Sequence, residues 1–226
     1  GAGKSTIIQR IMNCIPNTFG FSVSHTTRQP REGEQHGIQY FFVSKEEYDQ
    51  LIKENAFVEH AEVHGNCYGT SKAALDRVTA GDASSQVGKI CILDIDIQGC
   101  KQIKQRSDIH PLFIRVRVEI EELKKRLEKR GTETAESLET RLANARGELA
   151  VITVDDSTSS QKKDIPPVSH LHQNQPFFDL EVDNVREGVD GIIACARQIV
   201  QFLEDRGILL KRKEGGREIS NVDLIV

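Results

Sequence analysis

The chain has 226 residues, 38% of them hydrophobic and 28% charged, which indicates one large or composite globular domain and excludes collagen-like and wholly disordered classes. Its net charge of −4 excludes a general positive field for nucleic acid or an anionic membrane. No apolar run approaches the roughly 20 residues of a membrane span and no signal-peptide pattern opens the chain, so a cytoplasmic protein is expected.

The chain opens with a glycine-rich turn, Gly1-Ala2-Gly3-Lys4-Ser5-Thr6, and the following apolar residues have a helical period that ends at Pro16. This pattern matches the end of G-x-x-x-x-G-K-[ST], in which backbone N–H groups wrap phosphates, Lys reaches the outer phosphates and Ser or Thr ligates Mg²⁺. We therefore predict a nucleotide phosphate site rather than a helix start that is merely glycine-rich.

The first glycine of that motif and the strand that should precede it are absent, so a chain truncated at its start is expected. Such a strand normally lies in the middle of a parallel sheet. Its loss is expected to leave the neighbouring strands without ladder partners.

Short strands are predicted at 21–24, 40–43 and 57–63, with a helix begun by the capping box Ser44 to Glu47. These elements predict a small mixed α/β unit. Farther along, an apolar run from Ile90 is closed by Asp94 and Asp96, the pattern of a buried parallel strand with carboxylates at its end. A second such strand is predicted at 112–116.

Two charged helices, 119–130 and 134–150, are predicted on either side of Gly131 and form a mobile hairpin. The polar stretch 155–176 predicts an exposed loop, and the apolar period from Val189 to Leu203 predicts a closing amphipathic helix. Five cysteines without a C-x-x-C pair favour reduced, mostly buried thiols. His60 and His64 lie in a strand pattern at a spacing that disfavours shared metal ligation.

The segment Ser22-Val23-Ser24-His25-Thr26-Thr27-Arg28-Gln29-Pro30-Arg31, with Glu32-Gly33-Glu34 and Tyr40 after it, resembles the signature of guanylate kinases. Further segments resemble family motifs in the family's order: 57–59, 66–70, 92–99, 125–134 and 141–142. The similarity is strong from Gly1 to about Leu149. Departures from the family pattern are the connection 81–88, the loop 155–176 and residues 115–118.

The resemblance implies an α/β P-loop nucleoside monophosphate kinase fold with a parallel-sheet core, a small mixed α/β GMP-binding unit and a helical lid. The expected divisions are core at 1–20 and 81–118, GMP-binding unit at 21–80, lid at 119–154, polar loop insertion at 155–176, and closing strand, helix and tail at 177–226.

The resemblance also implies an acceptor site, and the residue chemistry agrees. Arg28 and Arg31 can supply forked donors to a phosphate, unless they belong only to a solvated loop. Glu59 can accept from the N1 and N2 donors of guanine, whereas adenine has an acceptor at N1. An exposed strand position is the alternative for Glu59. The predicted GMP-binding residues are Ser24, Arg28, Arg31, Tyr40, Glu59, Tyr68, Thr70 and Asp94.

For transfer, positioning and charge neutralisation carry most of the rate. The predicted catalytic residues are Lys4, Arg31, Arg130 and Arg141, the last two delivered by the closing lid unless they belong to a salt-bridged helix surface. The predicted ATP-binding residues are Gly1, Ala2, Gly3, Lys4, Ser5, Thr6 and Asn184, the last resembling the family's adenine-contacting asparagine. Ser5, Asp94 and Asp96 are predicted to hold Mg²⁺ directly or through water.

The predicted function is transfer of the terminal phosphoryl group of ATP to GMP in purine nucleotide metabolism, by a monomer with Mg²⁺ as the only cofactor. The alternatives are a guanylate-kinase-like protein-interaction module without catalysis and a P-loop kinase for another small substrate. A module that had lost catalysis would be free to lose Lys4, Arg31 and Asp94, and their presence favours the enzyme.

Overall fold

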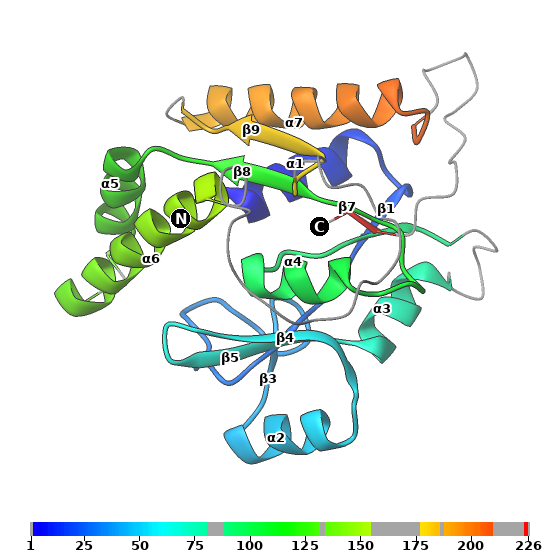
Figure 1. Cartoon of the computed structure of the whole chain (residues 1–226), viewed down its shortest axis with the longest axis vertical. Helices are drawn as coiled ribbons and strands as arrows, with labels where there is room; N and C mark the ends of the chain where they lie inside the picture. The colour runs from blue at the N-terminus through cyan, green and yellow to red at the C-terminus, as the bar shows by residue number, and fades with distance from the viewer. Residues whose placement is uncertain are drawn as a thin grey trace, which may run out of the picture.

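The structure is a computed structural model that describes residues 2–80, 88–131, 134–154, 177–185, 188–209 and 224–225; the side chains of 130, 148–154 and 224–225 are outside the description. Figure 1 shows a core sheet in the upper half, a smaller unit below it, and the α5–α6 pair at one side. The helices are α1 (Lys4–Cys14), α2 (Lys45–Lys53), α3 (Lys72–Thr79), α4 (Ile97–Lys104), α5 (Ile120–Arg130), α6 (Ala135–Val154) and α7 (Gly188–Asp205). The strands are β1 (Phe19–Phe21), β2 (His25–Thr26), β3 (Phe41–Phe42), β4 (Phe57–Val63), β5 (Asn66–Ser71), β6 (Ile90–Ile92), β7 (Pro111–Leu112), β8 (Ile114–Arg117), β9 (Leu180–Asp183) and β10 (Leu224–Ile225).

The core sheet is parallel, as the apolar strands predicted. Its strand order is β1-β6-β10-β7, and β8 follows β7 after one residue and pairs in parallel with β9. Helices α1 and α7 pack together above this sheet (Figure 1), and Ile7, Ile199 and Leu203 are buried against Ile92 and Val182. The sheet and these two helices therefore share one hydrophobic core. This core holds α1, and with it the glycine-rich turn that precedes α1, at a fixed position beside the sheet.

The middle of the core sheet is filled by the C-terminal segment β10. Leu224 and Ile225 are in parallel register with Cys91 and Ile92 on one side, and β7 pairs with them on the other. The expectation that the central strands lack ladder partners is therefore wrong at these positions, because β10 supplies the backbone N–H and C=O groups. The rest of the predicted tail, residues 210–223 and Val226, lies outside the described residues.

The small unit has the predicted mixed composition. Its sheet order is β3-β2-β5-β4, and β5 is antiparallel to both β2 and β4. The capping box that begins α2 is present, with Ser44 Oγ accepting from Glu47 N and the Glu47 side chain accepting from Ser44 N. The unit has its own buried cluster around Tyr48, Phe57 and Cys67, while Val58 of β4 joins the buried cluster of the core around Cys91 and Cys100.

One buried hydrogen bond in this unit provides a test of its packing. The Tyr48 hydroxyl donates to the Tyr68 carbonyl oxygen at 2.6 Å, and the Tyr48 side chain is fully buried. Replacing Tyr48 with phenylalanine is expected to lower the free energy of unfolding by about 1 to 2 kcal/mol, because the bond is lost without a change in shape. Urea denaturation of both proteins measures the difference, and equal midpoints would contradict it.

The charged helical hairpin is formed by α5 and α6. Helix α5 ends at Gly131, whose φ of 66° suits glycine at a helix end. Leu123, Leu127 and Leu142 form a small buried cluster between the two helices. The hairpin therefore has an apolar seam of its own and presents charged side chains elsewhere.

Several other expectations can be compared with the described residues. All five cysteines are free thiols and only Cys14 is exposed, which confirms the prediction of reduced, mostly buried cysteines. The polar loop 155–176 and most of the connection 81–88 lie outside the described residues. In the part of the chain that the structure describes, no helix is long and apolar enough to cross a membrane.

Candidate active site

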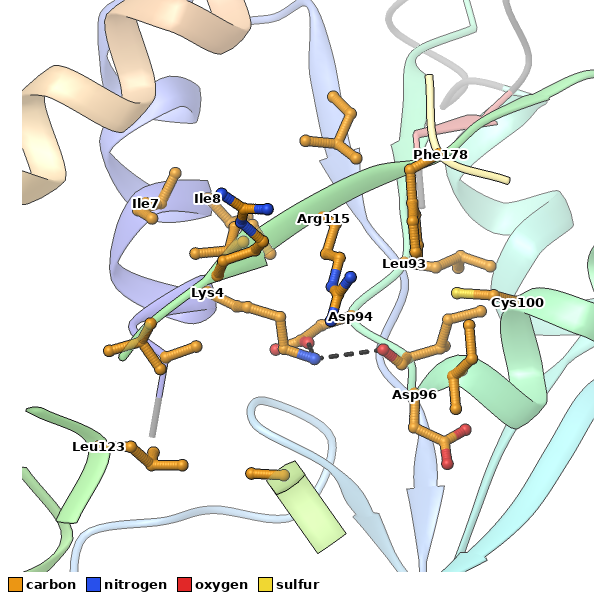
Figure 2. Close-up of a pocket in the computed structure, with 18 of the residues that line it drawn as sticks. Lys4, Ile7, Ile8, Leu93, Asp94, Asp96, Cys100, Arg115, Leu123 and Phe178 are labelled. Atoms are coloured by element: carbon orange, nitrogen blue, oxygen red, sulfur yellow. Dashed lines mark hydrogen bonds and ion pairs between the residues drawn. The ribbon is translucent and has the colours of Figure 1, made fainter. Parts of the chain in front are cut away.

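A cleft lies between the core, the small unit and the charged hairpin. Its volume is about 1070 Å³, and its walls include α1, the end of β6, β4, β5, α5 and α6. A second cavity of about 370 Å³ adjoins it between β6 and β8 (Figure 2) and is lined mainly by aliphatic side chains. The larger cleft gathers most of the predicted site residues, among them Arg28, Arg31, Arg141 and Glu59. Its predicted lining residues are Ala2, Gly3, Lys4, Ser5, Thr6, Ser24, Arg28, Arg31, Tyr40, Glu59, Tyr68, Asp94, Asp96 and Arg141.

The phosphate loop leads directly into α1. Gly3 is the N-cap residue and has a φ of 87°, a left-handed conformation that glycine adopts without strain. The free N–H groups of a helix N-terminus and its positive dipole end favour a bound anion. This geometry agrees with the predicted phosphate site at residues 2–6, while Gly1 lies outside the described residues.

Lys4 and Ser5 meet Asp94 at the end of β6. Lys4 Nζ lies 2.7 Å from Asp94 Oδ1 and donates to the Ile95 carbonyl at 3.2 Å, and Ser5 Oγ donates to Asp94 Oδ2 at 3.3 Å. Figure 2 shows the Lys4 and Asp94 side chains pointing toward one another. Desolvation opposes the Lys4 charge, but the Asp94 carboxylate outweighs it and raises the pKa of Lys4. The ammonium group is thus held charged at the mouth of the loop.

Asp96 lines the cleft and also caps the N-terminus of α4. It is the N-cap of α4, where Oδ1 accepts from Gly99 N at 3.0 Å, and Oδ2 accepts from Gln98 Nε2 at 2.9 Å. Both carboxylate oxygens therefore already accept a hydrogen bond. This arrangement favours contact with a metal through water over direct ligation.

Glu59 is buried on β4, which excludes the alternative of an exposed strand residue. Only 3% of Glu59 is exposed, and its Oε1 accepts from Thr70 N at 2.8 Å. A Cβ atom at Gly99 would lie 2.5 Å from Glu59 Oε2, so glycine is needed where α4 passes the carboxyl group. Desolvation raises the pKa of Glu59 to about 7. The buried carboxyl group can accept further hydrogen bonds from a ligand in the cleft.

Two hydroxyl groups complete the surroundings of Glu59. Ser24 Oγ and Thr70 Oγ1 lie 3.3 Å apart, and both residues are buried. Each hydroxyl can donate or accept. The three side chains together form a polar patch that can match a planar ring with both donors and acceptors.

The two arginines of the β2–β3 loop have different surroundings. Arg28 is paired with Glu34 through Nη2 at 2.9 Å and lies 5.4 Å from the centre of the Tyr40 ring. Arg31 N donates to Glu34 Oε2 at 2.7 Å. Partial burial opposes the charge of Glu34, but these hydrogen bonds outweigh it and lower the pKa of Glu34. Glu34 therefore organises the loop, and both arginines line the cleft.

Arg141 and Arg126 come from the charged hairpin. Arg141, on α6, lines the same cleft as the phosphate loop. Arg126, on α5, donates to the Asn184 carbonyl oxygen at 3.0 Å and to Glu122. The side chain of Arg130 lies outside the described part of the chain, so its predicted role stays a prediction.

Asn184 follows β9 and lies under the phosphate loop. It is 1% exposed, its Nδ2 donates to the Ala2 carbonyl oxygen at 2.8 Å, and a Cβ atom at Gly3 would lie 2.7 Å from the same nitrogen. Its Oδ1 accepts no hydrogen bond from the described residues. Asn184 therefore braces the loop, while its predicted contact with adenine stays a prediction.

Residues 1–158 match the family model described as guanylate kinase. The chain belongs to the guanylate kinase family. It is 49% identical over 150 residues to guanylate kinase 1 of Oryza sativa subsp. japonica, a match that covers 66% of this chain and 37% of that protein. It is 46% identical over 150 residues to the guanylate kinase of Sus scrofa, covering 66% and 72%. The chain thus spans just over a third of the rice protein and nearly three quarters of the pig protein.

The fold agrees with this membership. The crystal structure of guanylate kinase from Anaplasma phagocytophilum superposes with a TM-score of 0.55 at 23% identity, covering 93% of this chain and 86% of that one. The P-loop kinase fold predicted from the sequence is therefore confirmed as a fold. The match to the family model ends at residue 158, so β9, α7 and β10 lie outside the matched residues.

Two cationic residues that line the cleft of this guanylate kinase family member, Arg126 and Lys129, were not predicted as site residues. Arg126 reaches the loop and Asn184, and Lys129 lines the same wall. In the sequence Arg126 precedes Arg130 by four residues, a spacing that predicts one shared face on a helix. That spacing was a signal in the sequence that could have identified Arg126.

Proposed function

We propose that this chain transfers the terminal phosphoryl group of ATP to GMP, giving ADP and GDP. The observation that carries the proposal is the buried Glu59 carboxyl group, with Ser24 and Thr70 beside it, in the same cleft as the phosphate loop. Guanine presents adjacent N–H donors at N1 and N2 that one carboxylate can accept. The names of the relatives in the guanylate kinase family support the same substrate pair.

The acceptor phosphate would lie toward Arg31, Arg28 and the two tyrosines. Forked guanidinium donors suit a phosphate dianion, and Tyr40 and Tyr68 are in contact through their rings at 5.9 Å. Glu59 lines the cleft from β4 and the two arginines line it from the β2–β3 loop, so base and phosphate would be held by different elements of the small unit. This placement would direct the phosphate oxygen toward Lys4.

The donor side is formed by residues 2–6 and Lys4, which would neutralise the charge of the moving phosphoryl group. Ser5 Oγ and the Asp94 carboxylate lie 3.3 Å apart and offer the oxygen ligands that Mg²⁺ prefers, with Asp96 acting through water. When bound with ATP, Mg²⁺ supplies positive charge to the phosphate oxygens. Among the described residues no group of three or more His, Cys, Asp or Glu side chains is arranged to hold a metal, so the phosphates would complete the coordination.

Helices α5 and α6 would act as a lid. Arg141 lines the cleft from α6, and closure of the hairpin would exclude water and bring Arg141 to the transferred group. A monomeric state and a cytoplasmic location complete the proposal.

The function is tested by mixing the purified chain with ATP and Mg²⁺ and one of GMP, AMP, CMP or UMP. GDP and ADP formation with GMP alone is the expected result. Turnover of a different monophosphate would assign the chain another acceptor. Absence of turnover with every substrate would favour the protein-interaction module, since Lys4, Arg31 and Asp94 would then serve no reaction.

The raised pKa of Glu59 gives a pH dependence with a definite sign. Only the ionised carboxyl group can accept from both guanine donors, so kcat/KM for GMP is expected to rise as the pH increases through about 7. The matched Glu59→Gln variant should lack this transition, and equal pH profiles would contradict the assignment.

The same carboxyl group gives a pH dependence of stability. Between pH 4.5 and about 7 the folded protein keeps Glu59 protonated, whereas the unfolded chain ionises it. The free energy of unfolding should therefore fall as the pH rises through this range.

A further inference from the structure

The tip of the β4–β5 hairpin is built unusually for a turn. Val63 pairs with Asn66, so the connection has two residues, His64 and Gly65, with φ values of 52° and 73°. Two positive φ angles define a type I′ turn, in which glycine and asparagine are favoured and a histidine at the first position is not. Asn66 Nδ2 donates to the His64 carbonyl oxygen at 3.1 Å and holds the turn. The imidazole is therefore presented from a fixed position.

The ring of His64 reaches the charged hairpin. Asn144 Nδ2, on α6, lies 3.1 Å from His64 Nδ1. An amide nitrogen can only donate, so His64 Nδ1 is the acceptor in this contact. This contact joins two parts of the chain that are 80 residues apart, the small unit and the proposed lid.

Asn144 is in a position to control a cleft residue. It follows Arg141 by three residues, which places both on the same face of α6. His64, Arg141 and Asn144 line one continuous cavity beside Lys4. A tether at Asn144 therefore fixes the turn of α6 that carries the Arg141 guanidinium.

We propose that His64 and Asn144 are positioning residues whose hydrogen bond holds α6 against the small unit and keeps Arg141 over the cleft. The proposal rests on the proposed function, in which Arg141 neutralises the transferred phosphoryl group. Neither His64 nor Asn144 contacts the reacting atoms. The contact forms only while the hairpin helices lie against the β4–β5 tip, so it acts as a clamp on the closed arrangement.

Substitutions at His64 and Asn144 can remove the hydrogen bond while leaving the conformation of the turn intact. His64→Gly removes the ring and suits the positive φ, whereas His64→Asn keeps an acceptor oxygen close to the place of Nδ1 and also tolerates this φ. Asn144→Ala removes the donor. Arg146→Ala, an exposed change on α6, is the matched control.

His64→Gly and Asn144→Ala are each expected to lower kcat with ATP and GMP by about fivefold, the effect of one neutral hydrogen bond. KM for GMP should change by less than a factor of about two, because the residues proposed to bind GMP are intact. The double variant should lose no more than either single variant. His64→Asn should retain most of the activity, and Arg146→Ala all of it. The proposal would be overturned if the losses in kcat of the two single variants multiplied in the double variant. It would also be overturned if His64→Asn were as slow as His64→Gly.

A measurement without catalysis distinguishes the clamp from the proposed function. Hydrogen exchange of the α6 amides around Asn144, in the nucleotide-free protein, should be faster in His64→Gly and Asn144→Ala and unchanged in Arg146→Ala. Unchanged exchange in all variants would overturn the clamp even in an active kinase. A wild-type chain without guanylate kinase activity would overturn the positioning role together with the proposed function, whatever the exchange shows about the contact.

Discussion

Replacing Lys4 with methionine is expected to lower kcat for GMP phosphorylation by about 10³-fold. The Lys4 ammonium group lies 2.7 Å from Asp94 at the start of α1, where the outer phosphates of ATP would lie. Methionine keeps the length of the side chain and removes the charge that the transition state needs. Initial rates at saturating ATP and GMP measure the loss.

The fold should survive this change. Asp94 lines the cleft and still accepts from Ser5 Oγ when the ammonium group is removed, so its carboxylate keeps a hydrogen-bond donor. The matched control is Lys53→Met at the exposed end of α2, which should leave kcat unchanged. A Lys4→Met protein that is folded and retains more than about a tenth of the wild-type rate would remove Lys4 from the catalytic residues.

Replacing Glu59 with glutamine is expected to reduce the preference for GMP over AMP by about 10²-fold in the ratio of kcat/KM values. The amide offers one acceptor and one donor where the carboxylate offered two acceptors, so one guanine N–H group faces a donor. The same amide suits the acceptor at N1 of adenine. Competition between GMP and AMP in one assay gives the ratio directly.

Glu62→Gln is a close control for this variant. Glu62 lies on the same strand as Glu59 but is exposed on the opposite face, and the change in charge is identical. It should leave the ratio unchanged. Stability should not fall in Glu59→Gln, because the cost of burying an ionised carboxyl group disappears. An unaltered GMP to AMP ratio would show that another residue selects the base.

Most elements of the fold could be predicted because their signals are local. The apolar stripe of α1, the capping box at Ser44 and the helical period before Leu203 each lie within a few residues of the element they define. β10 could not be predicted in this way. Leu224 and Ile225 form a very short apolar run, and only the gap between β6 and β7 gives it a place in the sheet.

In the candidate site, too, some features could be predicted from the sequence and others depend on contacts with distant residues. Residue types and their order in the sequence predict Lys4, Arg31, Glu59 and Asp94 as site residues, and the structure brings all four to one cleft. What the sequence could not indicate is which polar atoms are already occupied. Asp96 is committed to capping α4, and the pairing of Arg28 with Glu34 depends on the shape of one loop.

Contacts between distant segments were also beyond prediction. The pairing of His64 with Asn144 depends on how far the α5–α6 hairpin leans over the small unit, and neither residue belongs to a catalytic pattern. The hydrogen bond from Asn184 to the Ala2 carbonyl oxygen of the phosphate loop joins residues 182 positions apart, and the predicted contact of Asn184 with adenine stays a prediction. Its position follows from β9 being aligned beside β8.

The placement of β10 and α7 has a consequence for the order in which the molecule folds. The small unit is closed by hairpins and a helix whose partners are near in sequence, whereas the core sheet waits for β9, α7 and finally β10. Loop closure over such separations slows folding. During synthesis the small unit would therefore form first, while the core strands stay exposed until β10 has left the ribosome. Any aggregation of the nascent chain should begin at β6 and β7 rather than in the small unit.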